Sequence, residues 1–140
     1  EITERDAIDD PDEARQSAEA LCDLGVTLVL DDFGTGYGSP ELLRSLPFGG
    51  LKLDRHFVAA SGSSSIDNLI ARHSADLARA LQISSVAEGI ESEEVAIGMR
   101  VLGLTHGQGY FFGRPLSPAE AFDHPQQWHP AQTNHHWDAP

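Results

Sequence analysis

The chain has 140 residues, of which 40% are hydrophobic, enough for a folded core and too many for a disordered chain. Its 22 acidic residues outnumber its 9 basic ones, giving a net charge of −13 at pH 7. This balance argues against a nucleic-acid polymer as partner, because few cations are available to neutralise a phosphate backbone. A small anionic substrate stays compatible with it, since bound divalent cations reverse the sign of the charge locally.

The N-terminus of the sequence carries no targeting signal that we recognise. The chain begins with Glu1 rather than Met, and it has neither a basic and apolar leader nor an apolar run of about 18 residues. We therefore expect a fragment of a longer protein. The lone Cys22 excludes an internal disulfide and fits a reducing compartment.

The first part of the chain predicts alternating helices and strands. Asp10 followed by Pro11 is typical of a helix N-terminus, and Gly25 stands where that helix would end. The short apolar run 26–30 is typical of a strand that is covered on both faces. The next expected elements are a loop over residues 31–40, a helix over 41–46 and a strand over 51–53.

The second part continues the alternation. A small-residue loop over 61–65 leads to the clearest helix, over 66–81. One face of this helix is expected to be lined by Ile66, Leu69, Ile70, His73, Leu77 and Leu81. The remaining expected elements are a strand over 83–87, a helix from Ser92 to about Leu102 that ends at Gly103, and a strand that ends near Gln108.

This alternation predicts an α/β fold with a parallel sheet and covering helices. An eight-stranded TIM-type (β/α) barrel needs about 250 residues, so the chain is either a small open sheet or roughly the C-terminal half of such a barrel. Residues 1–123 hold the predicted elements. Residues 124–140 are expected to form an irregular tail rich in His, Pro and Gln, whose histidine spacing matches no ordinary metal-ligand pattern.

Polar and mostly acidic residues stand where the predicted strands begin or end. They are Glu1 before the first apolar pair, Asp31 and Asp32 after Leu30, Lys52 and Asp54 in and after the next strand, Glu88 after Ala87, and Gln108 at the last strand. In parallel α/β folds the C-terminal ends of the strands form the active-site face. Carboxylates from several strands are therefore expected to converge on one patch.

Clustered carboxylates repel one another unless a cation lies among them, and Mg²⁺ or Mn²⁺ prefers such oxygen ligands. Divalent ions of this kind suit phosphodiester hydrolysis, because they activate water and stabilise charge on phosphoryl oxygens. A lysine among the acids, here Lys52, can orient the nucleophile or offset developing charge. The residue types alone therefore indicate a metal-assisted hydrolase.

Each of these residues also has a purely structural interpretation. Adjacent acids such as Asp31 and Asp32 often form a turn, and Glu88 before a glycine is compatible with an ordinary loop acid. Glu1 and Gln108 are uninformative alone. Lys52 differs from them, because an unpaired ammonium inside an apolar strand is costly and favours a partner or a function.

Five stretches in a fixed order give the sequence a specific resemblance. They are Glu-Ile-Thr-Glu (1–4), Asp-Asp-Phe-Gly-Thr-Gly-Tyr (31–37), Leu-Pro-Phe-Gly-Gly-Leu-Lys-Leu-Asp-Arg (46–55), Val-Ala-Glu-Gly-Ile-Glu-Ser (86–92) and Gln-Gly-Tyr-Phe-Phe-Gly-Arg-Pro (108–115). Their order and spacing resemble those of the EAL phosphodiesterase family. The resemblance covers nearly the whole of residues 1–123, which we interpret as the C-terminal part of an EAL domain.

The resemblance implies a TIM-type barrel that hydrolyses cyclic di-GMP to a linear dinucleotide with Mg²⁺ or Mn²⁺. It implies metal ligands at Glu1, Asp31, Asp32 and Glu88, and catalytic roles for Lys52, Glu88, Asp32 and Gln108. By the same resemblance, Glu4 steadies the loop after Asp32. Asp54, Arg114 and Pro115 would lie at the substrate edge. The resemblance also implies cyclic di-GMP as a ligand, an upstream sensory or cyclase domain and a cytoplasmic location, which is compatible with a parent protein that is anchored to a membrane through upstream domains.

The sequence also departs from the family pattern. The Glu-Ala-Leu motif that names the family and a metal-binding Asn are both absent from these 140 residues. Gly38 and Gly49 stand where family members usually have Ser and Asp. We therefore expect the isolated fragment to be inactive.

Two alternatives to an enzyme stay open from the sequence. One is a degenerate EAL domain that binds cyclic di-GMP as a receptor without cleaving it. The other is an interaction module, because a half-barrel leaves unpaired sheet edges and apolar faces that favour association. On the same physical basis we expect a homodimer.

Overall fold

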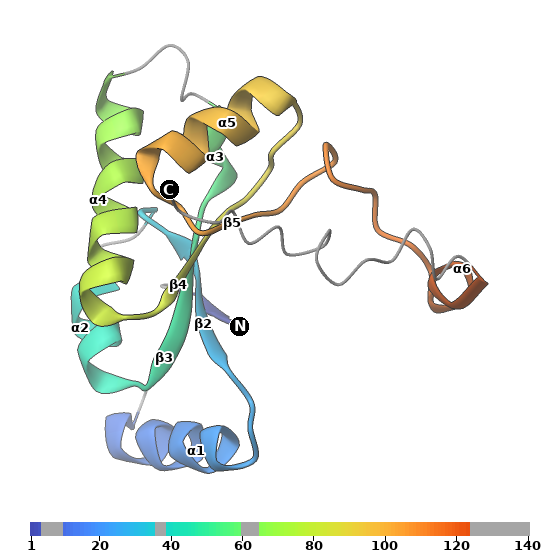
Figure 1. Cartoon of the computed structure of the whole chain (residues 1–140). Helices are drawn as coiled ribbons and strands as arrows, with labels where there is room; N and C mark the ends of the chain where they lie inside the picture. Colours follow the sequence, from blue (N-terminus) through green and yellow to red (C-terminus); the bar gives the residue numbers. More distant parts are fainter. Residues whose placement is uncertain (4–9, 36–38, 60–64, 124–140) are drawn as a thin grey trace.

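A computed structural model of the chain describes residues 1–3, 10–35, 39–59 and 65–123 (Figure 1). Within them the strands are β1 (Ile2–Thr3), β2 (Leu28–Phe33), β3 (Phe48–Leu53), β4 (Ser84–Ala87) and β5 (His106–Gly107). The helices are α1 (Pro11–Asp23), α2 (Ser39–Ser45), α3 (Arg55–Ala59), α4 (Ser65–Leu81), α5 (Glu93–Leu102) and α6 (Pro118–Asp123). The expected tail, residues 124–140, and residues 61–64 of the expected loop over 61–65 lie outside the described residues, and Ser65 is the first residue of α4.

The five described strands form one parallel sheet in the order β1-β2-β3-β4-β5. This is the chain order of neighbouring strands in a TIM-type barrel, whereas a doubly wound open sheet reverses its strand order at a switch point. The α/β class with parallel strands is therefore confirmed, and the strand order favours part of a barrel over a small open sheet.

The helices pack on the sheet as the strand-helix alternation predicts. Figure 1 shows α4 alongside β3 and β4, and α4 also contacts α3 and α5. One buried cluster lies between the end of β3 and the helices α3, α4 and α5, and a second joins α1 to β2 and β3. The last helix, α6, lies at the end of an extended segment that leads away from the sheet (Figure 1).

The helix ends are those that the sequence signals predict. The Asp10 carboxylate accepts hydrogen bonds from the backbone N–H groups of Asp12 and Glu13, at 3.0 and 3.1 Å. The Ser92 hydroxyl caps α5 by accepting from the Val95 N–H at 3.3 Å. Gly103 ends α5 in the left-handed conformation, with φ of 101°.

The predicted boundary of the second strand was wrong. We expected the strand to end at Leu30, but β2 continues through Asp31 and Asp32 to Phe33. The acids stay in the sheet because Asp31 pairs with Thr3 of β1 and Phe33 pairs with Leu53 of β3. Pairing on both sides therefore overrides the preference of Asp for turns.

The predicted apolar face of α4 was wrong in part, although Ile70 is half-buried and packs against the first core cluster. Ile66 and Leu69, which we expected on the core side, have exposed fractions of 66% and 53%. The fully buried residues of α4 are small instead, and they are Ala71, Ser74, Ala75 and Ala78. Small side chains let the helix axis approach the sheet closely, so the larger apolar groups lie at the flanks. The helices α3 and α6 were not predicted.

Candidate metal centre at the ends of the strands

Lys52 is the centre of an ion-pair cluster contributed by four strands or strand ends. Its ammonium lies 2.5 Å from Glu88 Oε1, 3.1 Å from Glu1 Oε1 and 3.4 Å from Asp31 Oδ1. The Lys52 side chain is 8% exposed, whereas that of Glu1 is 57% exposed. The expectation that this lysine needs a partner is therefore confirmed, and it has three.

A bulge in β2 brings two consecutive carboxylates to the same side of the sheet. Leu30 pairs with Leu51 and Phe33 pairs with Leu53, so that Asp31 and Asp32 together stand opposite Lys52 alone. Neighbouring residues of a regular strand point to opposite faces, and a two-against-one bulge removes this constraint. Asp32 has a φ of 55°, in the left-handed region that non-glycine residues adopt rarely.

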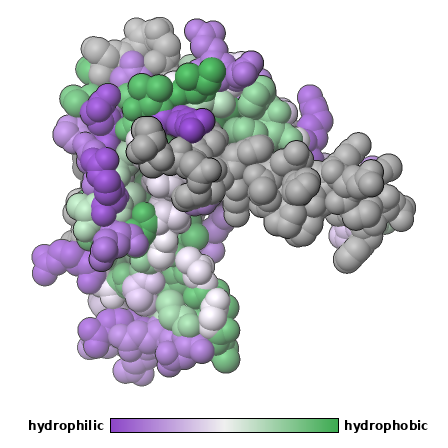
Figure 2. Space-filling view, viewed as in Figure 1, coloured by the Kyte–Doolittle hydropathy of each residue, from purple (hydrophilic) through white to green (hydrophobic). Residues whose placement is uncertain are grey.

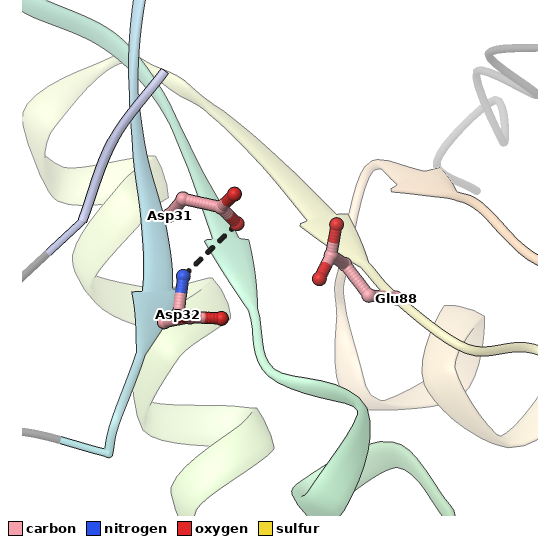
Figure 3. A group of neighbouring side chains, drawn as sticks. All are labelled: Asp31, Asp32 and Glu88. Carbon is pink, nitrogen blue, oxygen red and sulfur yellow. Dashed lines mark hydrogen bonds between the residues drawn. The ribbon is translucent and has the colours of Figure 1, made fainter.

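Asp31, Asp32 and Glu88 form a group suited to a divalent cation. Each offers one carboxylate oxygen, and these oxygens lie within 4.8 Å of one another. Figure 3 shows Asp31 and Asp32 on β2 and Glu88 at the end of β4, with the carboxylates of Asp31 and Glu88 turned toward each other. Three converging carboxylates match the oxygen-rich coordination that Mg²⁺ and Mn²⁺ prefer, so the residues fit the ion that the resemblance implies.

The electrostatics of the cluster follow from burial and from its charges. Burial alone would lower the pKa of Lys52, but hydrogen bonds to Glu88 and Glu1 and the charge of Asp31 outweigh it and raise that pKa. Burial also raises the pKa of Glu88, and the charges of Asp31 and Glu1 add to this, while Lys52 acts in the opposite direction. Burial has the largest effect on the pKa of Glu88, so the charged form of this carboxylate is destabilised. A further cation beside it would reduce that destabilisation.

The other predicted site residues are placed less centrally. Gln108 has an exposed side chain, and its backbone continues the β4–β5 pairing through a 2.8 Å bond from its N–H to the Ala87 carbonyl. Asp54 caps α3, because its carboxylate accepts from the His56 N–H at 2.8 Å. The catalytic role of Gln108 and the substrate role of Asp54 stay predictions.

The predicted substrate edge after β5 is exposed. The Arg114 guanidinium lies over the Tyr110 ring, 4.6 Å from its centre, and both side chains and Pro115 are exposed. The structure does not join Arg114 or Pro115 to the carboxylate cluster, so their substrate role stays a prediction. Glu4, the predicted loop-stabilising residue, lies outside the described residues.

One feature of the site, at Thr35, and one feature of the sheet, at Ser85, were missed in the sequence. Thr35 donates both its hydroxyl and its N–H to the Asp32 carbonyl, at 3.0 and 3.2 Å. Ser85, fully buried on β4, exchanges hydrogen bonds with Thr105, whose hydroxyl donates to the Ser85 carbonyl at 2.8 Å and accepts from the Ser85 N–H at 2.9 Å. A hydroxyl three residues after a strand-end acid is the signal that could have identified Thr35.

The fold and this cluster together define a parallel α/β protein whose strand order is that of part of a barrel, with three carboxylates at its strand ends that are suited to a divalent cation. The EAL domain family matches residues 1–115, and the chain belongs to that family. The predicted resemblance is therefore confirmed over most of the chain.

Three known proteins illustrate the likeness. The bifunctional diguanylate cyclase/cyclic di-GMP phosphodiesterase MucR of Pseudomonas aeruginosa is 40% identical over 120 residues, which are 86% of this chain and 17% of MucR. The crystal structure of the EAL domain of Mycobacterium smegmatis DcpA is 39% identical with a TM-score of 0.79, covering 85% of this chain and 53% of that one. A manganese/cyclic di-GMP complex of Klebsiella pneumoniae BlrP1 is 32% identical with a TM-score of 0.74, covering 81% and 29%.

The chain thus spans about half the length of the solved EAL domain of DcpA and a smaller part of its multidomain relatives. The solved EAL relatives are TIM-barrel domains, so the five parallel strands are part of such a barrel.

Figure 2 shows hydrophobic residues gathered over α5, where Ile97 and Val101 are 56% and 72% exposed. Among the described residues, no helix is long and apolar enough to cross a membrane.

Proposed function

We propose that the intact protein containing this chain hydrolyses cyclic di-GMP to a linear dinucleotide with Mg²⁺ or Mn²⁺. The observation that carries the proposal is the convergence of Asp31, Asp32 and Glu88, with oxygens within 4.8 Å of one another, beside the buried ammonium of Lys52. The family membership and the similarity to cyclic di-GMP phosphodiesterases support the choice of substrate.

Each residue has a distinct task in this proposal. Asp31, Asp32 and Glu88 hold the divalent cation, and Glu1 adds a further carboxylate at the edge of the cluster. Bound Mg²⁺ or Mn²⁺ supplies Lewis-acid stabilisation of phosphoryl charge and lowers the pKa of water. The Lys52 ammonium stays positively charged beside these carboxylates, where it orients the attacking water and faces the anionic phosphodiester. Gln108 helps to position that water from the end of β5.

The fragment alone is proposed to have little or no activity. The solved EAL domain of DcpA is about twice as long as the part that this chain matches, and the Glu-Ala-Leu and Asn ligands are absent from residues 1–140. Half of a barrel also leaves the outer edges of β1 and β5 without neighbouring strands in the described sheet. Upstream residues of the intact protein would supply the remaining strands and ligands.

The experiment is hydrolysis of cyclic di-GMP by the intact protein, with the product separated by chromatography. We expect a linear dinucleotide with Mg²⁺ or Mn²⁺, none with a chelator, and loss of turnover in an Asp31→Asn variant. Binding of cyclic di-GMP without cleavage would contradict the enzyme and favour the receptor. Substantial turnover by the purified 140-residue chain would contradict the proposed inactivity of the fragment.

We also propose the oligomeric state, an upstream domain and the location of the intact protein. A homodimer is supported by the exposed Ile97 and Val101 of α5, and light scattering would test it. An upstream sensory or cyclase domain is supported by the composition of MucR, a cyclase and phosphodiesterase in one protein. A cytoplasmic location rests on the proposed substrate alone, and fractionation of the intact protein would test it.

A further inference from the structure

We propose that Thr35 is a positioning residue that holds Asp32 in its left-handed conformation, so that Asp31 and Asp32 present their carboxylates to one cation. The inference rests on the proposed function, because it gives a task to a residue of the same site. It concerns Thr35 rather than the carboxylates themselves.

The β2 bulge needs local interactions that hold it. Asp32, at φ of 55°, adopts a conformation that an L side chain disfavours. A regular strand would avoid this cost and would also point Asp32 away from Asp31. The observed geometry therefore persists only where local bonds favour it over the regular strand.

Hydrogen bonds fix both peptide groups of Asp32. On its N-terminal side, the Asp32 N–H donates to Asp31 Oδ1 at 2.9 Å, the bond drawn in Figure 3. On its C-terminal side, the Asp32 carbonyl accepts the Thr35 hydroxyl at 3.0 Å and the Thr35 N–H at 3.2 Å. The orientation of that carbonyl sets the ψ angle of Asp32, so the Thr35 hydroxyl helps to select the bulged conformation.

The hydrogen bond from the Thr35 hydroxyl can be removed without changing the hydrophobic core. Thr35 is exposed, and so is its neighbour Gly34. Losing the hydroxyl therefore removes no apolar packing, and its effect should fall on the geometry of the two carboxylates. Because three carboxylates must meet within a single coordination shell, a small rotation of Asp32 weakens cation binding.

The test is the affinity of the metal-free intact protein for Mn²⁺, measured by calorimetry. Thr35→Val keeps the shape of the side chain and removes the donor, whereas Thr35→Ser keeps the donor. Thr27→Val makes the same change at an exposed threonine just before β2, at the opposite end of that strand. The melting temperature in chelator is measured for every variant, and Thr35→Ala provides a second variant without the hydroxyl.

We expect Thr35→Val and Thr35→Ala to bind Mn²⁺ roughly 3- to 10-fold more weakly, the effect of one net hydrogen bond. Thr35→Ser and Thr27→Val should bind like the wild type, and melting in chelator should be unchanged. Wild-type affinity in Thr35→Val, or equal weakening in Thr35→Ser, would overturn the positioning role while leaving the proposed function intact. A wild-type protein that binds no Mn²⁺ would contradict the proposed function itself, and the role of Thr35 with it.

Discussion

Replacing Lys52 with methionine should destabilise the metal-free protein and make its stability depend on divalent cations. Methionine has a similar length and suits a strand interior, so the change removes the charge with little loss of packing. Three carboxylates, those of Glu1, Asp31 and Glu88, then remain together without the ammonium that they share. Their mutual repulsion is the physical cause of the expected effect.

The size of the effect follows from the exposure of each partner. Glu1 is 57% exposed, so its pair contributes less than about 1 kcal/mol. Asp31 and Glu88 are only 18% and 19% exposed, and removing one partner of a buried pair costs about 3–5 kcal/mol. Because these acids keep some contact with water, we expect a loss of about 2–3 kcal/mol in the free energy of unfolding.

The assay is denaturant unfolding of the intact protein in chelator and again with Mn²⁺. Arg79→Met is the matched control, because the Arg79 ion pair with Asp76 has side chains 74% and 47% exposed and should contribute little. We expect Mn²⁺ to restore most of the stability that Lys52→Met loses. Equal stability of Lys52→Met and the wild type in chelator would contradict the stabilising role of the Lys52 ammonium. A loss of stability that Mn²⁺ does not reduce would contradict repulsion among the carboxylates as its cause.

Two further predictions concern Glu88 and the turn after β5. Burial raises the pKa of Glu88 in the folded state, so the folded protein binds the proton of this carboxyl group more tightly than the unfolded chain does. The free energy of unfolding should therefore fall as the pH rises from the ordinary carboxyl pKa through the raised pKa of Glu88. Unfolding in chelator across that range should show this fall in the wild type and a smaller one in Glu88→Gln, and equal slopes would contradict the assignment. Gly109→Ala should lower the free energy of unfolding by at least about 2 kcal/mol, because a Cβ there would lie 2.1 Å from the Ile90 carbonyl oxygen. The control is Gly98→Ala in α5, where a Cβ meets nothing within 4 Å and should raise the free energy of unfolding by about 0.5–1 kcal/mol. Thermal melts of both variants check this, and similar shifts would count against the packing at Gly109.

Much of the site could be predicted from the sequence because it depends on strand ends. Apolar runs identify where parallel strands lie, and acids that follow them must meet at one edge of the sheet. This is why Asp31, Asp32 and Glu88 were grouped correctly and why Lys52 was expected to need partners. The family resemblance added the proposed reaction, whereas the residue types alone indicate only a metal-assisted hydrolase.

The rest depends on pairing and close packing that a single sequence does not display. The extension of β2 to Phe33 follows from the neighbouring strands on both sides, and the left-handed Asp32 lies in the bulge that places two residues of β2 opposite Lys52. The core face of α4 was mistaken because small residues such as Ala71 and Ala75 are buried there, while the large Ile66 is exposed. Residue size, not only hydrophobicity, decides which face approaches a sheet.

Anomalous scattering from a crystal of the intact protein grown with Mn²⁺ would test whether Asp31, Asp32 and Glu88 bind one divalent cation. Asp31, Asp32 and Glu88 are expected to coordinate a manganese ion together, because their oxygens already lie within 4.8 Å of one another. We expect an anomalous peak among these three carboxylates, with Lys52 beside it. Manganese bound elsewhere, with Lys52 still pairing the carboxylates and no peak between them, would contradict it.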